Sequence, residues 1–283
     1  MLNHTRQLFR QLRRILGVLG GTSLILLAQT TSAAPKSELL DFWFDSDENS
    51  SNTIDHQPWQ GFLDQYIVAE TSGINLLKYG AVSKNAHKSL KDYIDTLQTV
   101  DARQYNRSEQ IAYWINLYNA LTVDIVLDAY PTKSILKIGG SFFSPGPWNK
   151  KRLTIADQKL SLNDIEHGIL RPIWKDSRIH YAVNCASFSC PNLSAVAFTA
   201  KNTEEQLTSA AKDYINNPRG IKIDGDDLLL SKIFDWYQVD FGNNETELLQ
   251  QLATYAEPEL AERLRNHDGD IDYDYDWTLN EAK

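Results

Sequence analysis

Residues 109–130, EQIAYWINLYNALTVDIVLDAY, give the strongest helix signal in the chain. Ser108 offers an N-cap immediately before this segment, and Pro131 ends it. Apolar side chains cover a wide arc, which predicts a helix buried on most sides at the centre of the core. Asn116 and Asn119 lie one turn apart within that arc. We therefore expect a helix-rich α+β domain organised around residues 109–130.

The two amides within this helix have two interpretations. A buried amide without a hydrogen bond costs about 1–3 kcal/mol, so both side chains need partners. Asn116 and Asn119 either hold the backbone of a neighbouring loop or orient a catalytic histidine. The helix pattern does not decide between these roles.

The segments on either side predict further helices and a small antiparallel sheet. Their periodicity, caps and turn residues indicate the elements that follow. Helices are expected over 84–100, 203–216 (with Thr203 and Gln206 as a capping box), 232–241, 245–256 and 259–265, hairpins over 152–162 and 221–230, and strands over 179–184 and 270–277. The plan resembles papain-like and transglutaminase-like enzymes, an analogy at the level of the fold.

The N-terminus has the order of a secretory signal peptide. Four arginines within the first 14 residues precede an apolar run, residues 15–28, and small residues end at Ala33. The run is shorter than the roughly 20 residues that span a bilayer. We predict a signal peptide over 1–33, export to the periplasm or the extracellular space, and no stable membrane anchor after cleavage.

The mature chain is expected to contain an N-terminal helical extension, 34–100, and a main domain, 101–283. Without the four arginines it has 24 basic and 37 acidic residues, a net charge of −13. Nucleic acids and anionic lipids require clustered Lys and Arg, so this charge argues against both as partners. The expected partner is a small molecule or a peptide, and no cofactor is predicted.

Residues 161–193, SLNDIEHGILRPIWKDSRIHYAVNCASFSCPNL, concentrate the groups that carry out chemistry. They include both cysteines of the chain, Cys185 and Cys190, together with Glu166, His167 and His180. Bases, nucleophiles and metal ligands come from these residue types. Any active site is therefore expected here.

The first interpretation is a thiol hydrolase or transferase. An activated cysteine needs a histidine within reach and usually a third group that orients this histidine. Cys185, at the end of the predicted strand, is the candidate nucleophile, with His167 or His180 as base. Asn116 or Glu166 would orient the base.

Three other interpretations remain open. Cys185 and Cys190 are close in sequence and could form a structural or redox-active disulfide in an oxidising compartment. The thiols could bind zinc together with His167 and His180, although no familiar ligand spacing is present. Both cysteines could also be inert core residues.

Five ordered stretches closely resemble the domain-of-unknown-function family numbered 547. They are YWINLYNALTVDIVL (113–127), SLNDIEHGILR (161–171), RIHYAVNCASFSCPNL (178–193), LSKIFDWYQVDFG (230–242) and DYDWTLN (274–280). The resemblance covers roughly residues 100 to 280. It implies a bacterial or plant domain and supplies no reaction.

The resemblance also implies a set of site residues, namely Asn116, Glu166, His167, His180 and Cys185. The family motif often has Gly after the first cysteine, where this chain has Ala186. Some members carry Ser at the position of Cys190, which favours Cys185 as the more important thiol.

Two hypotheses follow. The first is an exported hydrolase or acyltransferase that uses Cys185 on a peptide or cell-envelope amide. The second is a non-catalytic binding or scaffold domain, in which a Cys185–Cys190 disulfide stiffens a recognition loop. An aromatic groove containing Trp114, Trp148 and Trp174 would then bind the ligand.

Overall fold

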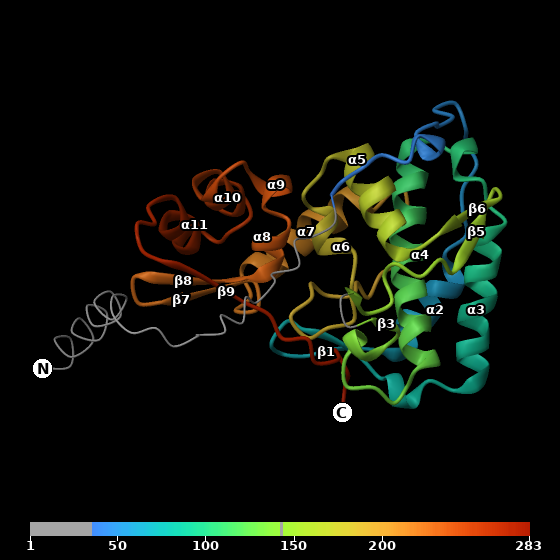
Figure 1. Cartoon of the computed structure of the whole chain (residues 1–283), viewed down its shortest axis with the longest axis horizontal. Helices are drawn as coiled ribbons and strands as arrows, with labels where there is room; N and C mark the ends of the chain where they lie inside the picture. The colour runs from blue at the N-terminus through green and yellow to red at the C-terminus, as the bar shows by residue number, and fades with distance from the viewer. Residues whose placement is uncertain (1–35, 142–143) are drawn as a thin grey trace, which may run out of the picture. The chain divides into compact units, whose positions relative to one another are not determined.

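The computed structural model describes residues 36–141 and 144–283. The signal peptide predicted for residues 1–33 lies outside these ranges. Helices and small sheets alternate along the chain, which confirms the α+β class (Figure 1). Two hydrophobic clusters organise the described residues.

The predicted central helix is α4, Arg107–Asp128. Every residue from Glu109 to Val126 is buried, as expected for a core helix. The N-cap is Asn106 rather than Ser108: the Asn106 side chain accepts a hydrogen bond from the N–H of Glu109. Asn and Ser are similarly good N-cap residues, so residue type alone does not distinguish Asn106 from Ser108. The start of the helical backbone at Arg107 determines which residue is the cap.

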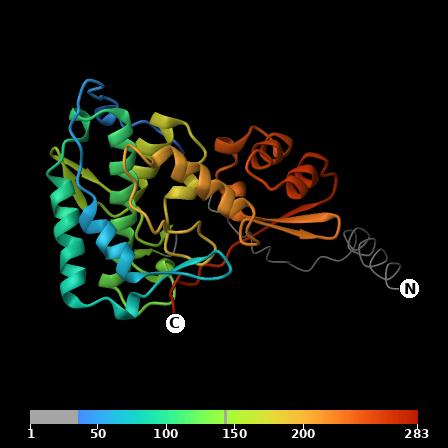
Figure 2. The same cartoon turned by 180° about the vertical axis from the view of Figure 1, so that it is seen from behind.

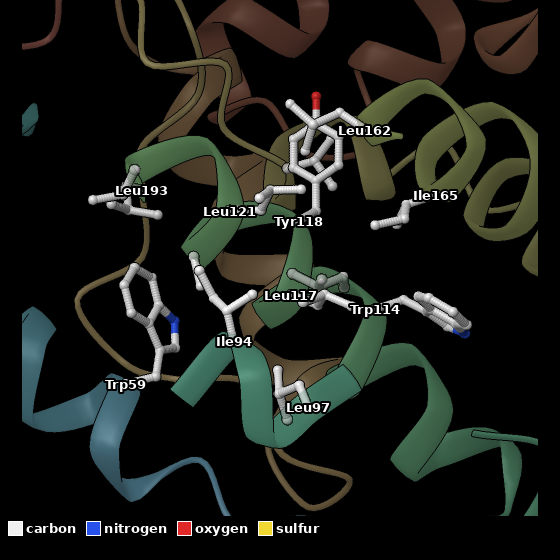
Figure 3. Packing of buried hydrophobic residues seen from close by; sticks show 14 of the residues in the cluster. Trp59, Ile94, Leu97, Trp114, Leu117, Tyr118, Leu121, Leu162, Ile165 and Leu193 are labelled. Atoms are coloured by element: carbon white, nitrogen blue, oxygen red, sulfur yellow. The ribbon is translucent and has the colours of Figure 1, made fainter. Parts of the chain in front are cut away.

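Helices α2 (Gln57–Tyr66) and α3 (Lys84–Gln98) pack into the first cluster with α4. The buried stripe of α3 consists of Leu90, Tyr93, Ile94 and Leu97, as its periodicity predicts. Figure 3 shows Ile94 of α3 near Leu117 of α4, and Figure 2 shows α3 and α4 from behind. Residues of the predicted N-terminal extension thus share one core with α4.

Three antiparallel strand pairs border this cluster. They are β1 (Ile67–Ala69) with β2 (Asn75–Leu77), β3 (Gly140–Ser141) with β4 (Ser144–Pro145), and β5 (Leu153–Ile155) with β6 (Gln158–Leu160). The last pair is the hairpin predicted over 152–162. Its turn residues Ala156 and Asp157 have φ values of 45° and 62°, the left-handed conformation that two-residue hairpin turns require.

The second cluster is built from the C-terminal part of the chain. Its elements are α7 (Thr203–Ile215), β7 (Ile221–Asp224), β8 (Asp227–Ser231), α8 (Lys232–Trp236), α9 (Gln238–Phe241), α10 (Glu245–Leu252), α11 (Pro258–Arg265) and β9 (Ile271–Asp274). Strand β9 pairs with β8 in parallel, and its side chains alternate in burial. A strand was predicted here, but this sheet is mixed rather than purely antiparallel.

Short helical segments complete the described chain. They are η1 (Asp41–Trp43), η2 (Tyr79–Ala81), η3 (Ala102–Gln104), η4 (Ile135–Lys137), the π-helical η5 (Asp164–Leu170), α5 (Arg171–Trp174) and α6 (Ile179–Ala182). The last of these corrects the strand predicted over 179–184. The side chains of Ile179, His180, Tyr181 and Ala182 are all buried. The alternation of residue types in this stretch therefore did not indicate a strand with one buried and one exposed face.

Two further predictions on helix ends are wrong. Thr203 begins α7 without capping it, because its hydroxyl donates to the carbonyl of Thr199. The helix predicted over 232–241 breaks at Tyr237 into α8 and α9. The break places Tyr237 and Asp240 against the histidines described below.

Candidate active site

The loop after α6 carries both cysteines, and neither is in a disulfide. Cys185 is half-buried and Cys190 is buried. Asn119 of α4 fixes the start of the loop: its side-chain amide donates to the carbonyl of Ala182, and its oxygen accepts the N–H of Asn184, at 2.9 and 2.8 Å. The amide thus has the loop-holding role rather than the histidine-orienting one.

Two distant segments hold the remainder of the cysteine loop. The Arg219 guanidinium donates to the carbonyls of Phe188 and Cys190, each at 3.0 Å. In the C-terminal segment, the carbonyl of Thr278 accepts a hydrogen bond from the N–H of Phe188 at 2.7 Å. Ala186 has a φ of 60°, a conformation that glycine adopts more easily.

Two hydroxyl groups and a second thiol surround the sulfur of Cys185. The Ser187 hydroxyl lies 3.1 Å from Sγ and the Tyr275 hydroxyl 3.2 Å from it, and the neighbouring Cys190 thiol also stabilises the thiolate form of Cys185. Burial raises the pKa of Cys185, but these hydrogen bonds stabilise the thiolate and lower the pKa to about 7. Burial, and then the neighbouring Cys185, raise the pKa of Cys190 well above its ordinary value.

Glu166 and His167 lie on the π-helical segment η5. Within this helix the backbone carbonyl of His167 has no N–H donor five residues further along the chain. Pro172 has no N–H and cannot bond the carbonyl of His167 as the fifth residue along a π-helix would. The N–H of Glu38 donates to that carbonyl instead, at 3.0 Å, and the N–H of Leu40 to the next one, at 2.8 Å. The N-terminal segment therefore stabilises the turn that presents both predicted residues.

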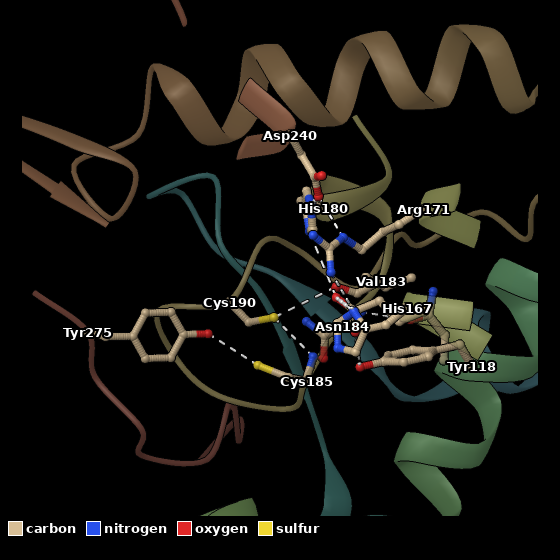
Figure 4. A network of polar contacts seen from close by, with 12 residues as sticks. Tyr118, His167, Arg171, His180, Val183, Asn184, Cys185, Cys190, Asp240 and Tyr275 are labelled. Carbon is tan, nitrogen blue, oxygen red and sulfur yellow. Dashed lines mark hydrogen bonds and ion pairs between the residues drawn. The ribbon is translucent and has the colours of Figure 1, made fainter. Parts of the chain in front are cut away.

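A buried network joins both histidines to carboxylates and an arginine (Figure 4). Asp240 accepts hydrogen bonds from His180 Nε2 at 2.7 Å and from Arg171 Nε at 2.6 Å. Burial alone would raise the pKa of Asp240, but these two bonds lower it to about 2. Asp240 is thus ionised at neutral pH. Glu166 accepts from the Tyr118 hydroxyl at 3.0 Å, and its other oxygen lies 3.8 Å from His180 Nδ1.

Partners fix the proton positions on the two imidazoles. Arg171 is always a donor, so His167 Nδ1, 3.0 Å from Arg171 Nη1, accepts and the ring proton lies on Nε2. Burial, with the Arg171 charge added, lowers the pKa of His167. His180 Nε2 donates to ionised Asp240, which leaves His180 Nδ1 able to accept a proton. Tyr237 stacks on His180 with ring centroids 4.1 Å apart.

The predicted cysteine–histidine pair is not in direct contact. Among residues 36–141 and 144–283, no hydrogen bond or ion pair joins Cys185 to His167 or His180. Tyr118, which donates to Glu166, and Tyr237, which stacks on His180, lie between the histidine network and the charge of Cys185 that acts on them. Burial raises the pKa of both phenols, and the charges of Glu166 and Cys185 raise it further. The thiol and the histidine network are therefore neighbouring parts of one site.

Other predicted groupings do not form. Asn116 holds the backbone of Phe198 through bonds of 2.7 and 3.0 Å and has no bond to a histidine. Trp114 is a core residue with 1% exposure, and Trp174 packs near Arg107. Trp148 instead belongs to a half-buried aromatic patch beside the thiols, made of Trp148, Trp236, Tyr275 and Trp277.

The predicted zinc ligands do not form a metal-binding group either. Within the described part of the chain, the His, Cys, Asp and Glu side chains close enough to hold an ion are His87, Asp124 and Asp128. The Lys91 ammonium already lies 2.7 and 2.9 Å from these two carboxylates. A positive charge at this point disfavours a divalent cation.

Sequence reasoning missed several residues of the site. Asp240 and Tyr237 lie in the stretch 230–242, and Tyr275 lies in 274–280. Both stretches contributed to the family resemblance, which was the available signal. Arg171 likewise ends the stretch 161–171. Their roles depend on contacts with residues far away in sequence.

The family described as "Protein of unknown function, DUF547" matches residues 102–215. The resemblance to DUF547 is thereby confirmed. The DUF547 match contains α4, η5 and the cysteine loop, while Asp240 and Tyr275 lie beyond it. No curated protein and no solved structure matches the chain. None of the helices described has both the length and the apolar character needed to cross a membrane.

Proposed function

We propose that this protein is an exported hydrolase or acyltransferase whose nucleophile is Cys185. The observation that carries the proposal is the half-buried Cys185 sulfur, which is hydrogen-bonded to the hydroxyls of Ser187 and Tyr275. A thiolate present at neutral pH attacks carbonyl carbons without a base directly beside it. The hydroxyls of Ser187 and Tyr275 take the place of the imidazolium of a cysteine–histidine pair.

The reaction proceeds through a thioester. The Cys185 thiolate attacks the carbonyl carbon of a peptide or cell-envelope amide, the C–N bond breaks, and the amine leaves after taking up from solvent water the proton that the thiol had released to it. Water then attacks the thioester, giving a carboxylic acid and the free thiol; in a transferase, a second amine or alcohol replaces water. The acidic mature chain favours neutral or cationic substrates.

His180 is assigned to the second step. Its Nδ1 can accept a proton, whereas His167 Nδ1 is occupied by Arg171. Asp240 orients His180, a role that the sequence assigned to Asn116 or Glu166. Since no hydrogen bond joins Cys185 to a histidine among the described residues, His180 is needed to activate the attacking water and not to ionise the thiol.

Acyl trapping tests both steps. The full chain is incubated with p-nitrophenyl acetate at pH 8, quenched in acid and mapped by peptide mass spectrometry. The expected adduct is a hydroxylamine-sensitive acetyl group on Cys185, with the buried Cys190 as the internal comparison. His180→Gln should acylate at an unchanged rate and accumulate more thioester than the wild type. No acyl group on a reduced Cys185 would overturn the proposal.

A further inference from the structure

Cys190 has a specific geometric relation to Cys185. The backbone N–H of Cys185 donates a hydrogen bond to Cys190 Sγ at 3.0 Å, and each thiol alters the pKa of the other. The other contact of this sulfur is a long one, 3.9 Å to the carbonyl of Val183. Both sulfurs therefore belong to one loop, and Cys190 Sγ is bonded directly to the backbone of Cys185.

The two thiols differ in accessibility and acidity. Cys185 is half-buried and has a pKa of about 7, whereas Cys190 is buried and has a raised pKa. Oxidants react with an accessible, acidic thiol first. A second thiol adjacent to it then determines whether the first oxidation product persists.

We infer that Cys190 is a resolving thiol, so that peroxide oxidation of Cys185 ends in a reversible Cys185–Cys190 disulfide. Hydrogen peroxide oxidises the Cys185 thiolate to a sulfenic acid, transferring one oxygen atom and releasing hydroxide. The Cys190 sulfur then attacks the Cys185 sulfur, the S–O bond breaks, and water leaves. A dithiol reductant restores both thiols.

The disulfide would remove the nucleophile and would thus act as a redox switch. The oxidation chemistry stands on the sulfur geometry alone, while the loss of acyl transfer rests on the proposed function. This modification also protects Cys185, since further oxidation of an unresolved sulfenic acid is irreversible. Cys190, although buried, thus has the role of the resolving thiol.

The test is stoichiometric oxidation of the reduced full chain by hydrogen peroxide at pH 7, with dimedone present to trap sulfenic acid. In the wild type we expect a peptide pair linked through Cys185 and Cys190, little dimedone adduct, and full reversal by dithiothreitol. Cys190→Ser should accumulate the dimedone adduct on Cys185 at least tenfold. Cys185→Ser, the matched control, should leave Cys190 unmodified.

Two results would overturn the inference. One is a dimedone adduct on wild-type Cys185 as abundant as in Cys190→Ser, and the other is a disulfide that links two chains. The linked peptide in the wild type is decisive even if Cys190→Ser does not fold. Because the readout is the mass of the protein, failure here is distinguishable from failure of acyl trapping.

Discussion

Asn119→Ala should destabilise the protein and also change the reactivity of Cys185. The variant removes the two hydrogen bonds that fix the backbone of Ala182 and Asn184, of 2.9 and 2.8 Å. Both backbone groups belong to buried residues. Two lost bonds with unsatisfied partners cost about 2–4 kcal/mol of unfolding free energy. The loosened loop should also weaken the convergence of donors on Cys185.

Asn116→Ala provides a matched comparison. Asn116 lies on the same helix, is equally buried, and makes the same pair of backbone bonds, but to Phe198. Urea titration should give a similar loss of stability for both variants. Alkylation of Cys185 by iodoacetamide as a function of pH should shift to higher pH for Asn119→Ala alone. Equal shifts in both variants, or none, would refute the reasoning that Asn119 positions the thiol loop.

Three further predictions concern single contacts. Tyr275→Phe should raise the pKa of Cys185 by about one unit, because a hydrogen bond to a charged group contributes about 1.5–3 kcal/mol, and alkylation across pH measures it. Asp240→Asn should lower the unfolding free energy by about 2–3 kcal/mol in urea titrations, since the buried side chains of Arg171 and His180 lose the carboxylate that accepts their hydrogen bonds. His56 is buried and its pKa falls to about 4, so its neutral form favours the folded state. The stability it contributes is complete above pH 6.5 and is lost as pH falls toward 4, about 2 kcal/mol between pH 7 and 5, a loss that His56→Gln should remove.

Each of these predictions has a control and a contrary outcome. Tyr273→Phe alters a nearby tyrosine, on β9, that has no bond to Cys185; an equal pKa change in both variants would contradict the hydrogen-bond account. Asp235→Asn changes an exposed carboxylate and should be nearly neutral, whereas equal losses would show a general charge effect. For His56, the contrary result is an acid sensitivity that persists unchanged in His56→Gln.

Local sequence patterns predicted correctly those helices and hairpins whose burial or turn residues can be read from their own residue types. The helix α4 is buried on all sides, and its residue types show this without knowledge of the neighbours. The hairpin β5–β6 follows from its turn residues. The strand predicted over 179–184 was wrong because the side chains of this segment are buried on all sides. The alternation of residue types therefore carried no information about strand geometry.

The site could be predicted only in part, because its contacts are long-range. Residues 161–193 supplied the thiols, Glu166 and both histidines, as their composition suggested. Asp240 is 60 residues away from His180, and Tyr275 is 90 residues away from Cys185. No local period or spacing connects such pairs. The roles of Asp240 and Tyr275 emerge only when the C-terminal elements pack against the cysteine loop.

The most direct test of an activated Cys185 is alkylation of the reduced wild-type protein from pH 4 to 9, quantified separately for each cysteine by peptide mass spectrometry. The structure predicts a half-maximal rate for Cys185 near pH 7 and protection of Cys190 throughout this range. A rate for Cys185 that rises only near pH 9, or equal labelling of both cysteines, would contradict the account.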